Sequence, residues 1–189
     1  MAILSCPYDL PTGRLLALDL GQARTGVAVC DELGSLATPL GVLRRHPTRA
    51  EDYAEIAAWV ARERAVGVLV GMPLGSAGEV SAQARWVRRY AGRLTGALSV
   101  PVAFWDESFS TEEALRLVHE SGGRTPVDAA AAAVILGDFL DARRSVGEKE
   151  HGRVGEGEIQ ESHESISHSP PLPLPVSQTE ASCGSSMAQ

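Results

Sequence analysis

Residues 15–30 read LLALDLGQARTGVAVC, two apolar runs separated by a short polar turn. The first run is nearly continuous from Arg14 to Leu20, which is typical of a strand covered on both faces. The turn at residues 21–23 is too short for a crossover, so the second run, residues 25–30, should pair antiparallel with the first. One charged residue, Asp19, interrupts the first run just before its end.

The sequence beyond this hairpin predicts the rest of a mixed α/β sheet. A third strand is expected at residues 37–43, and apolar residues then take helical spacing over residues 49–64. Further strands are predicted at 66–70 and 100–105, and further helices at 79–95, between Ser110 and Gly122, and from Thr125 to about Arg144. This order, β-β-β-α-β-α-β-α-α, predicts a five-stranded sheet with helices on both faces, which is the architecture of the ribonuclease H-like fold.

The charge is unevenly distributed along the chain. Of the formal net charge of -7, residues 1–144 carry -2, from 17 acids and 15 bases, and residues 145–189 carry -5, from 7 acids and 2 bases. The last segment is rich in serine, glutamate and proline and buries too little apolar surface to offset its ordering entropy. We therefore predict a flexible N-terminus over 1–12, a folded domain over 13–144 and a disordered acidic, proline-rich tail over 145–189. No membrane span and no secretory signal is recognisable, so we expect a cytoplasmic protein.

Acidic residues from distant parts of the chain could meet at one edge of the sheet. An ionised carboxylate at Asp19, on a buried strand, costs several kcal/mol unless it is paired or binds a cation. Asp106 and Glu107 follow the fifth predicted strand, and strand alternation lets only one of them face Asp19. Asp128 lies in the first turn of the last helix, and the small residues 129–133 after it would let that helix approach the sheet closely.

A set of oxygen ligands without histidine or cysteine favours Mg²⁺ or Mn²⁺. Such ions could activate water and stabilise the leaving oxygen of a phosphodiester. Purely structural roles stay open at this point. Asp19 could cap the turn at Gly21 or pair with Arg24. The other acids lie before or within the first turn of a predicted helix, where a negative charge stabilises the helix dipole.

Arginine side chains are the candidate contacts to a polyanion. A series at nearly helical spacing within residues 79–95 should leave one face of that helix basic, although an ordinary solvated face is the alternative. The guanidinium of Arg24 has the geometry for bidentate contact to a phosphate. The alternative role for Arg24 is a salt bridge that orients Asp19. The basic series consists of Arg85, Arg88, Arg89 and Arg93.

Glycines after the fourth predicted strand form a third candidate feature. Gly71, Gly75 and Gly78 would allow the backbone to approach a phosphate closely, but the segment lacks the lysine of a P-loop. We interpret the segment as a candidate phosphate-binding loop that is not a P-loop.

Four segments resemble, in the right order, the motifs of the YqgF (RuvX) family. They are DLGQARTGVA at 19–28, GMPL at 71–74 with Gly78, WDE at 105–107 with the Ser-Thr pair at 110–111, and VDAAA at 127–131 with the helix that follows. The resemblance covers about residues 13–144. One position departs from the family pattern, because the family commonly has arginine where this chain has Ser108.

The resemblance implies a ribonuclease H-like protein, related to Holliday junction resolvases and described as a pre-16S rRNA nuclease. It implies Asp19, Asp106 or Glu107, and Asp128 as metal-binding catalytic carboxylates. We therefore predict a Mg²⁺- or Mn²⁺-dependent endonuclease for structured RNA, acting on the 5′ end of pre-16S rRNA in ribosome biogenesis. The alternatives are a junction-cleaving DNA nuclease, an ATPase of the related actin-like fold, and a non-catalytic RNA-binding or ribosome-assembly module.

Overall fold

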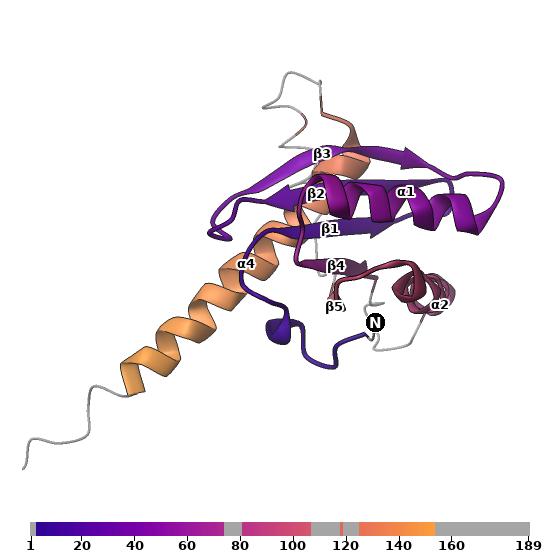
Figure 1. Ribbon diagram of the computed structural model, residues 1–189. Coiled ribbons are helices and arrows are strands. Elements are labelled where there is room, and N and C mark those ends of the chain that lie inside the picture. The colour runs from indigo at the N-terminus through magenta and orange to yellow at the C-terminus, as the bar shows by residue number, and fades with distance from the viewer. Residues whose placement is uncertain (1–2, 74–80, 107–117, 119–124, 154–189) are drawn as a thin grey trace, which may run out of the picture. The chain divides into compact units, whose positions relative to one another are not determined.

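The computed structural model of the protein describes residues 3–73, 81–106, 118 and 125–153 (Figure 1). Within these ranges the strands form one five-stranded sheet with the order β3-β2-β1-β4-β5. The strands are β1 (Leu15–Leu20), β2 (Arg24–Cys30), β3 (Ala37–Arg44), β4 (Gly67–Met72) and β5 (Val102–Asp106). The helices are α1 (Arg49–Arg62), α2 (Ala82–Leu94) and α4 (Val127–Arg153), with short 3-10 helices η1 (Pro7–Asp9) and η2 (Thr95–Ala97).

The strand pairing confirms the predicted topology. Strand β1 lies at the centre of the sheet and pairs antiparallel with β2, which pairs antiparallel with β3. Strand β4 is parallel to β1, and β5 is parallel to β4. The sheet is therefore mixed, with the expected antiparallel meander followed by helical crossovers.

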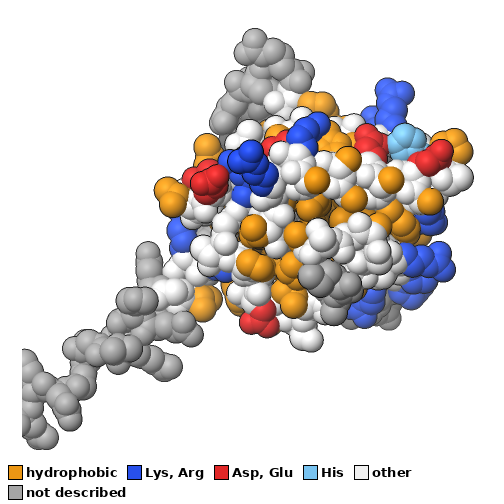
Figure 2. All heavy atoms as spheres, in the orientation of Figure 1, with side chains coloured by type: hydrophobic (Ala, Val, Ile, Leu, Met, Phe, Trp, Pro, Cys, Tyr) orange, Lys and Arg blue, Asp and Glu red, His pale blue; other side chains and the backbone are white. Residues whose placement is uncertain are grey.

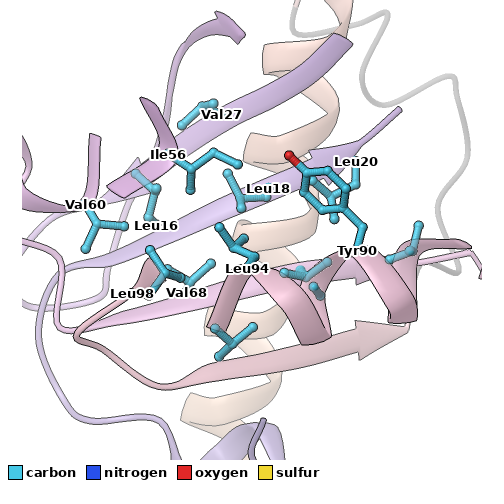
Figure 3. Close-up of a cluster of buried hydrophobic side chains, with 14 of the residues drawn as sticks. Leu16, Leu18, Leu20, Val27, Ile56, Val60, Val68, Tyr90, Leu94 and Leu98 are labelled. Carbon is cyan, nitrogen blue, oxygen red and sulfur yellow. The ribbon is translucent and has the colours of Figure 1, made fainter. Parts of the chain in front are cut away.

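Different helices cover the two faces of the sheet (Figure 1). Helices α1 and α2 lie on one face, and α4 crosses the other. Leu16 and Leu18 pack with α1 and α2, whereas Leu15 and Ala17 pack with α4. Figure 3 shows the first of these layers, in which the leucines of β1 meet Ile56 of α1. Burial on both faces explains why β1 has a nearly continuous apolar sequence.

Local capping interactions set where two helices begin. At α1, the Thr48 hydroxyl accepts the N–H of Glu51 at 3.4 Å and the Glu51 carboxylate accepts the N–H of Thr48 at 3.1 Å. At α2, the Ser81 hydroxyl accepts the N–H of Ala84 at 3.0 Å. These caps satisfy donors that a first helical turn leaves without intrahelical partners. They confirm the helix predicted over 49–64 and place the start of α2 at Ala82.

The segment before Gly13, which we expect to be flexible, is packed on the sheet from Ile3 onward. Ile3 forms a parallel bridge with Val102, and Leu4 donates its N–H to the Val102 carbonyl at 2.8 Å. Leu10 is buried against the backbone of Gly67. Contacts of the apolar residues Ile3 and Leu10 with the sheet thus stabilise an ordered position for this segment, which its composition alone does not indicate.

The last helix also departs from the predicted boundary. Helix α4 continues past Arg144 to Arg153, through a segment that has no proline to stop it and that includes glutamate and lysine as well as two glycines. The helix expected between Ser110 and Gly122 lies outside the described residues except for Val118, which is helical. Residues 154–189 also lie outside them, so the disordered tail stays a prediction. None of the helices that the structure describes has the length and apolar character needed to cross a membrane.

Candidate active site

Asp19 is the acidic residue of the central strand. By the alternation of β1 it shares the α4 face of the sheet with Leu15 and Ala17. Desolvation by burial, together with the nearby negative charge of Asp128, raises the pKa of Asp19 from 3.8 to about 6. A carboxyl group whose pKa is shifted this far by burial and a like charge is a functional-site candidate.

Asp128 lies near Asp19 because α4 approaches the sheet closely. Gly26 of β2 is paired with Asp19, and a Cβ atom at Gly26 would overlap the carbonyl oxygen of Asp128. Ala129 and Ala130, which follow Asp128, are completely buried. The sequence predicts this close approach from the small residues of the helix, and the register adds Gly26 as their counterpart on the sheet.

Arg24 contacts the second of these two acids. Its Nε lies 3.0 Å from Oδ2 of Asp128, and its side chain is 60% exposed. An ion pair this accessible contributes at most about 1 kcal/mol to stability. Of the two interpretations for Arg24, a salt bridge does form, but its partner is Asp128 rather than Asp19. The exposed guanidinium remains accessible to a bound anion at the edge of the acidic pair.

Asp106 does not join this pair. It is the last residue of β5, is paired with Met72 of β4 and is exposed. Trp105 packs with Tyr8 and Phe139 on the α4 side of the sheet, so alternation places Asp106 on the opposite side. In the described ranges no three histidine, cysteine or acidic side chains come close enough together to hold a metal ion. Glu107, the other candidate, lies outside these ranges.

Two side chains that the sequence analysis does not single out hold the turn after Asp19. Gln83, in the first turn of α2, donates its Nε2 to the Leu20 carbonyl at 3.2 Å and lies 3.5 Å from the Gln22 amide. Arg45, directly after β3, donates to the Gly21 carbonyl. Both are polar residues at the end of an element, a position that gives no distinctive sequence signal.

The basic series of α2 is exposed, as the helical spacing predicts. Its four arginines point away from Val87, Tyr90 and Leu94, which are buried against the sheet. Figure 2 shows a group of Lys and Arg side chains over this helix, besides others elsewhere on the same face. Helix α2 lies on the sheet face opposite Asp19, but Gln83 shows that its N-terminal end reaches the edge where β1 ends. The series therefore begins near the candidate site and runs away from it, in the order Arg85, Arg88, Arg89 and Arg93.

The glycine segment is described only at its start. Gly71 is a buried residue of β4 and pairs with Trp105 of β5. Gly75 and Gly78 lie outside the described residues, so a phosphate-binding role for this loop stays a prediction.

The strand order and strand directions define a ribonuclease H-like α/β fold. RuvC of Thermus thermophilus, solved in complex with a Holliday junction substrate, shares this fold with a TM-score of 0.51 and 20% sequence identity. The match covers 70% of this chain and 96% of that chain. The predicted fold class is thereby confirmed.

The chain belongs to the RuvX family. Residues 13–142 match the family model described as "Holliday junction resolvase". A protein of Anaeromyxobacter sp. (strain Fw109-5) named "Putative pre-16S rRNA nuclease" is 46% identical over 138 residues, which cover 70% of this chain and 99% of the relative. A protein of the same name from Synechococcus sp. (strain JA-3-3Ab) is 42% identical over 134 residues, covering 68% and 84%. These matches confirm the family that the sequence motifs indicate.

Proposed function

We propose that the protein is a metal-dependent endonuclease that cleaves structured RNA, with the 5′ region of pre-16S rRNA as its substrate. The observation that carries the proposal is the placement of Asp128 near Asp19, two carboxylates that the fold brings together despite their repulsion. Bringing like charges together in a partly desolvated position is unfavourable for stability alone, and a bound cation relieves that cost.

The donor atoms at this site suit Mg²⁺ or Mn²⁺, because both residues offer only carboxylate oxygens. Asp19 and Asp128 would hold the ion. As the third ligand we assign Glu107 rather than Asp106, since alternation turns Asp106 to the other side of the sheet. Divalent ions bound there would supply an activated water and stabilise the leaving oxygen of the phosphodiester.

The other side chains of the site act on the substrate backbone. Arg24, exposed beside Asp128, binds a phosphate next to the scissile bond through its remaining guanidinium donors. The arginines of α2 contact phosphates further along the strand and position the nucleic acid without reading its sequence. A local basic surface is required because the folded region carries no overall positive charge.

The names of the relatives support an RNA substrate, whereas the description of the family supports a four-way DNA junction as the second candidate. A non-catalytic RNA-binding module is the third, because Ser108 departs from the family pattern. The described residues offer no observation that favours ATP hydrolysis by an actin-like domain.

The three candidates are separated by incubating the full-length protein with labelled precursor 16S rRNA and with a four-way DNA junction, each with Mn²⁺ or EDTA. We expect Mn²⁺-dependent cleavage of the precursor, loss of cleavage in Asp19→Asn, and retention in the matched control Asp141→Asn, an exposed acid of α4. Preferential cutting of the junction would assign the protein to DNA. If the protein binds RNA without cleaving it, and Asp19→Asn does not change that binding, the result supports the non-catalytic RNA-binding module.

A further inference from the structure

The turn at residues 21–23 joins the strand that carries Asp19 to the strand that begins with Arg24, and one residue binds it at both ends. Arg45 donates Nη2 to the Gly21 carbonyl at 2.7 Å and Nε to the same oxygen at 3.2 Å. Its backbone N–H donates to the Ala23 carbonyl at 3.1 Å. These three hydrogen bonds come from a segment that is distant in sequence, so they constrain the turn independently of its own residues.

The guanidinium of Arg45 is itself fixed by a buried carboxylate. Its Nη1 lies 3.3 Å from Oδ2 of Asp52, which is only 6% exposed. The backbone N–H of His46 donates to Oδ1 of Asp52 at 2.7 Å, and the Tyr90 hydroxyl donates to Oδ2 at 3.4 Å. Burial raises the pKa of Tyr90, so its hydroxyl keeps the proton that it donates. Both carboxylate oxygens of Asp52 are thus hydrogen-bonded, and the carboxylate anchors Arg45.

Aromatic rings hold the plane of the same guanidinium. The Cζ of Arg45 lies 4.3 Å from the ring centroid of Tyr90 and 5.3 Å from that of Trp86, both on α2. A planar group with five fixed donors can stack on these rings while it bonds Asp52 on one edge and Gly21 on the other. A lysine ammonium, a point charge, cannot reproduce this combination.

We propose that Arg45 is a positioning residue that locks the turn after Asp19 and so keeps Asp19 and Arg24 aligned with Asp128. Arg45 contacts neither acid of the site: its side chain acts through the Gly21 carbonyl, and its backbone N–H holds the Ala23 carbonyl. Asp52 orients Arg45 in turn. The link to catalysis rests on the proposed nuclease function, whereas the locking of the turn rests on the hydrogen bonds alone.

The experiment measures backbone order and cleavage on the same full-length variants. In the wild type we expect a rigid amide at Gln22, which belongs to the same peptide unit as the Gly21 carbonyl, with a ¹⁵N order parameter near 0.85. Arg45→Met loses the two side-chain bonds to that carbonyl and keeps the backbone bond to Ala23, so we expect the Gln22 value to fall below about 0.6 while Leu16 and Leu18 stay rigid. On the precursor RNA, Arg45→Met should lower kcat about tenfold with KM changed less than twofold. Arg45→Lys should recover part of both effects.

The matched control is Arg14→Met, which removes an arginine paired with a carboxylate, Glu63, near the other end of β1. It should leave the turn amides and kcat unchanged.

If Arg45→Met does not fold, Arg45→Lys and Asp52→Asn carry the same measurement. Rigid turn amides in a folded variant would overturn the proposal. So would a mobile turn with wild-type kcat. Absence of cleavage in the wild type itself would instead remove the proposed function, and the order parameters would still decide whether Arg45 locks the turn.

Discussion

Gly26 of β2 lies so close to the backbone of Asp128 that any side chain at residue 26 would overlap the Asp128 carbonyl oxygen. Gly26 is also the residue paired with Asp19 across the β1–β2 ladder. One glycine therefore sets how near the two carboxylates come, by letting the first turn of α4 rest directly on the sheet.

The first prediction concerns this contact. Gly26→Ala should lower the free energy of unfolding by about 2–4 kcal/mol, since helix or strand must shift to accommodate a methyl group against backbone atoms. Urea denaturation measures the change. The matched control is Gly92→Ala in α2, where a Cβ meets no atom within 4 Å and alanine should be neutral or stabilising by up to about 1 kcal/mol. Equal stability of both variants would contradict the close approach.

Much of this arrangement is predictable from the sequence. The continuous apolar run of β1 and the change from strand to helical period fix the topology, and Asp19 is conspicuous because it interrupts an apolar strand. The alanines after Asp128 indicate a close helix, although their partner on the sheet, Gly26, follows only from the register.

Other features are beyond local sequence patterns. Asp52 stands one helical turn before Ile56 and two before Val60, so it continues the buried stripe of α1. That spacing was the one available signal for the buried carboxylate. Its partners Arg45 and Tyr90 come from different elements, and their meeting depends on how α1 and α2 pack together. The sequence also could not decide which side of the sheet Asp106 faces. That follows from the observed strand, in which Trp105 packs on the α4 side and Asp106, the next residue, faces the opposite side.

The second prediction is a pH dependence of stability without divalent ions. The pKa of Asp19 is about 6 in the folded protein and 3.8 in its ordinary state, so the folded form binds the proton more tightly. This contribution to stability is complete below about pH 4 and is lost as the pH rises through 6. Asp19→Asn should therefore be more stable than the wild type at pH 8, by about 1–3 kcal/mol, while the two differ little at pH 4.

Urea titrations of both proteins in EDTA at pH 4, 6 and 8 measure this difference. Asp141→Asn, which removes an exposed acid paired with Arg144, is the control and should show no comparable gain at pH 8. If the wild type is as stable as Asp19→Asn at pH 8, the ionised Asp19 carboxylate does not destabilise the folded protein, and the predicted rise in its pKa is contradicted.

The third prediction concerns Arg24. Arg24→Gln should change the free energy of unfolding by less than about 1 kcal/mol, because the ion pair with Asp128 is exposed. It should weaken binding of the precursor RNA and reduce the slope of log K against log salt by about one phosphate contact. Arg144→Gln, which breaks an exposed pair elsewhere, should leave RNA binding unchanged. Identical salt slopes for wild type and Arg24→Gln would exclude a phosphate contact at this residue.

The fourth prediction addresses the basic face of α2. A double variant, Arg85→Gln with Arg89→Gln, should reduce RNA affinity and the salt slope by about two contacts, with little change in stability because both side chains are exposed. The control, Arg62→Gln on α1, removes an exposed arginine stacked on Trp59. An equal loss of RNA affinity per charge removed in the α1 and α2 variants would indicate general electrostatics rather than a surface on α2.

The central claim is that Asp19 and Asp128 bind the divalent ion that supports RNA cleavage. Its most direct test is the single-turnover cleavage rate of precursor 16S rRNA as a function of Mn²⁺ concentration, for the wild type, Asp19→Asn, Asp128→Asn and Asp141→Asn. We predict saturable Mn²⁺ dependence for the wild type and Asp141→Asn, and rates at least about 100-fold lower for the other two at every Mn²⁺ concentration. Wild-type rates in Asp19→Asn, or cleavage by the wild type that persists in EDTA, would contradict the claim.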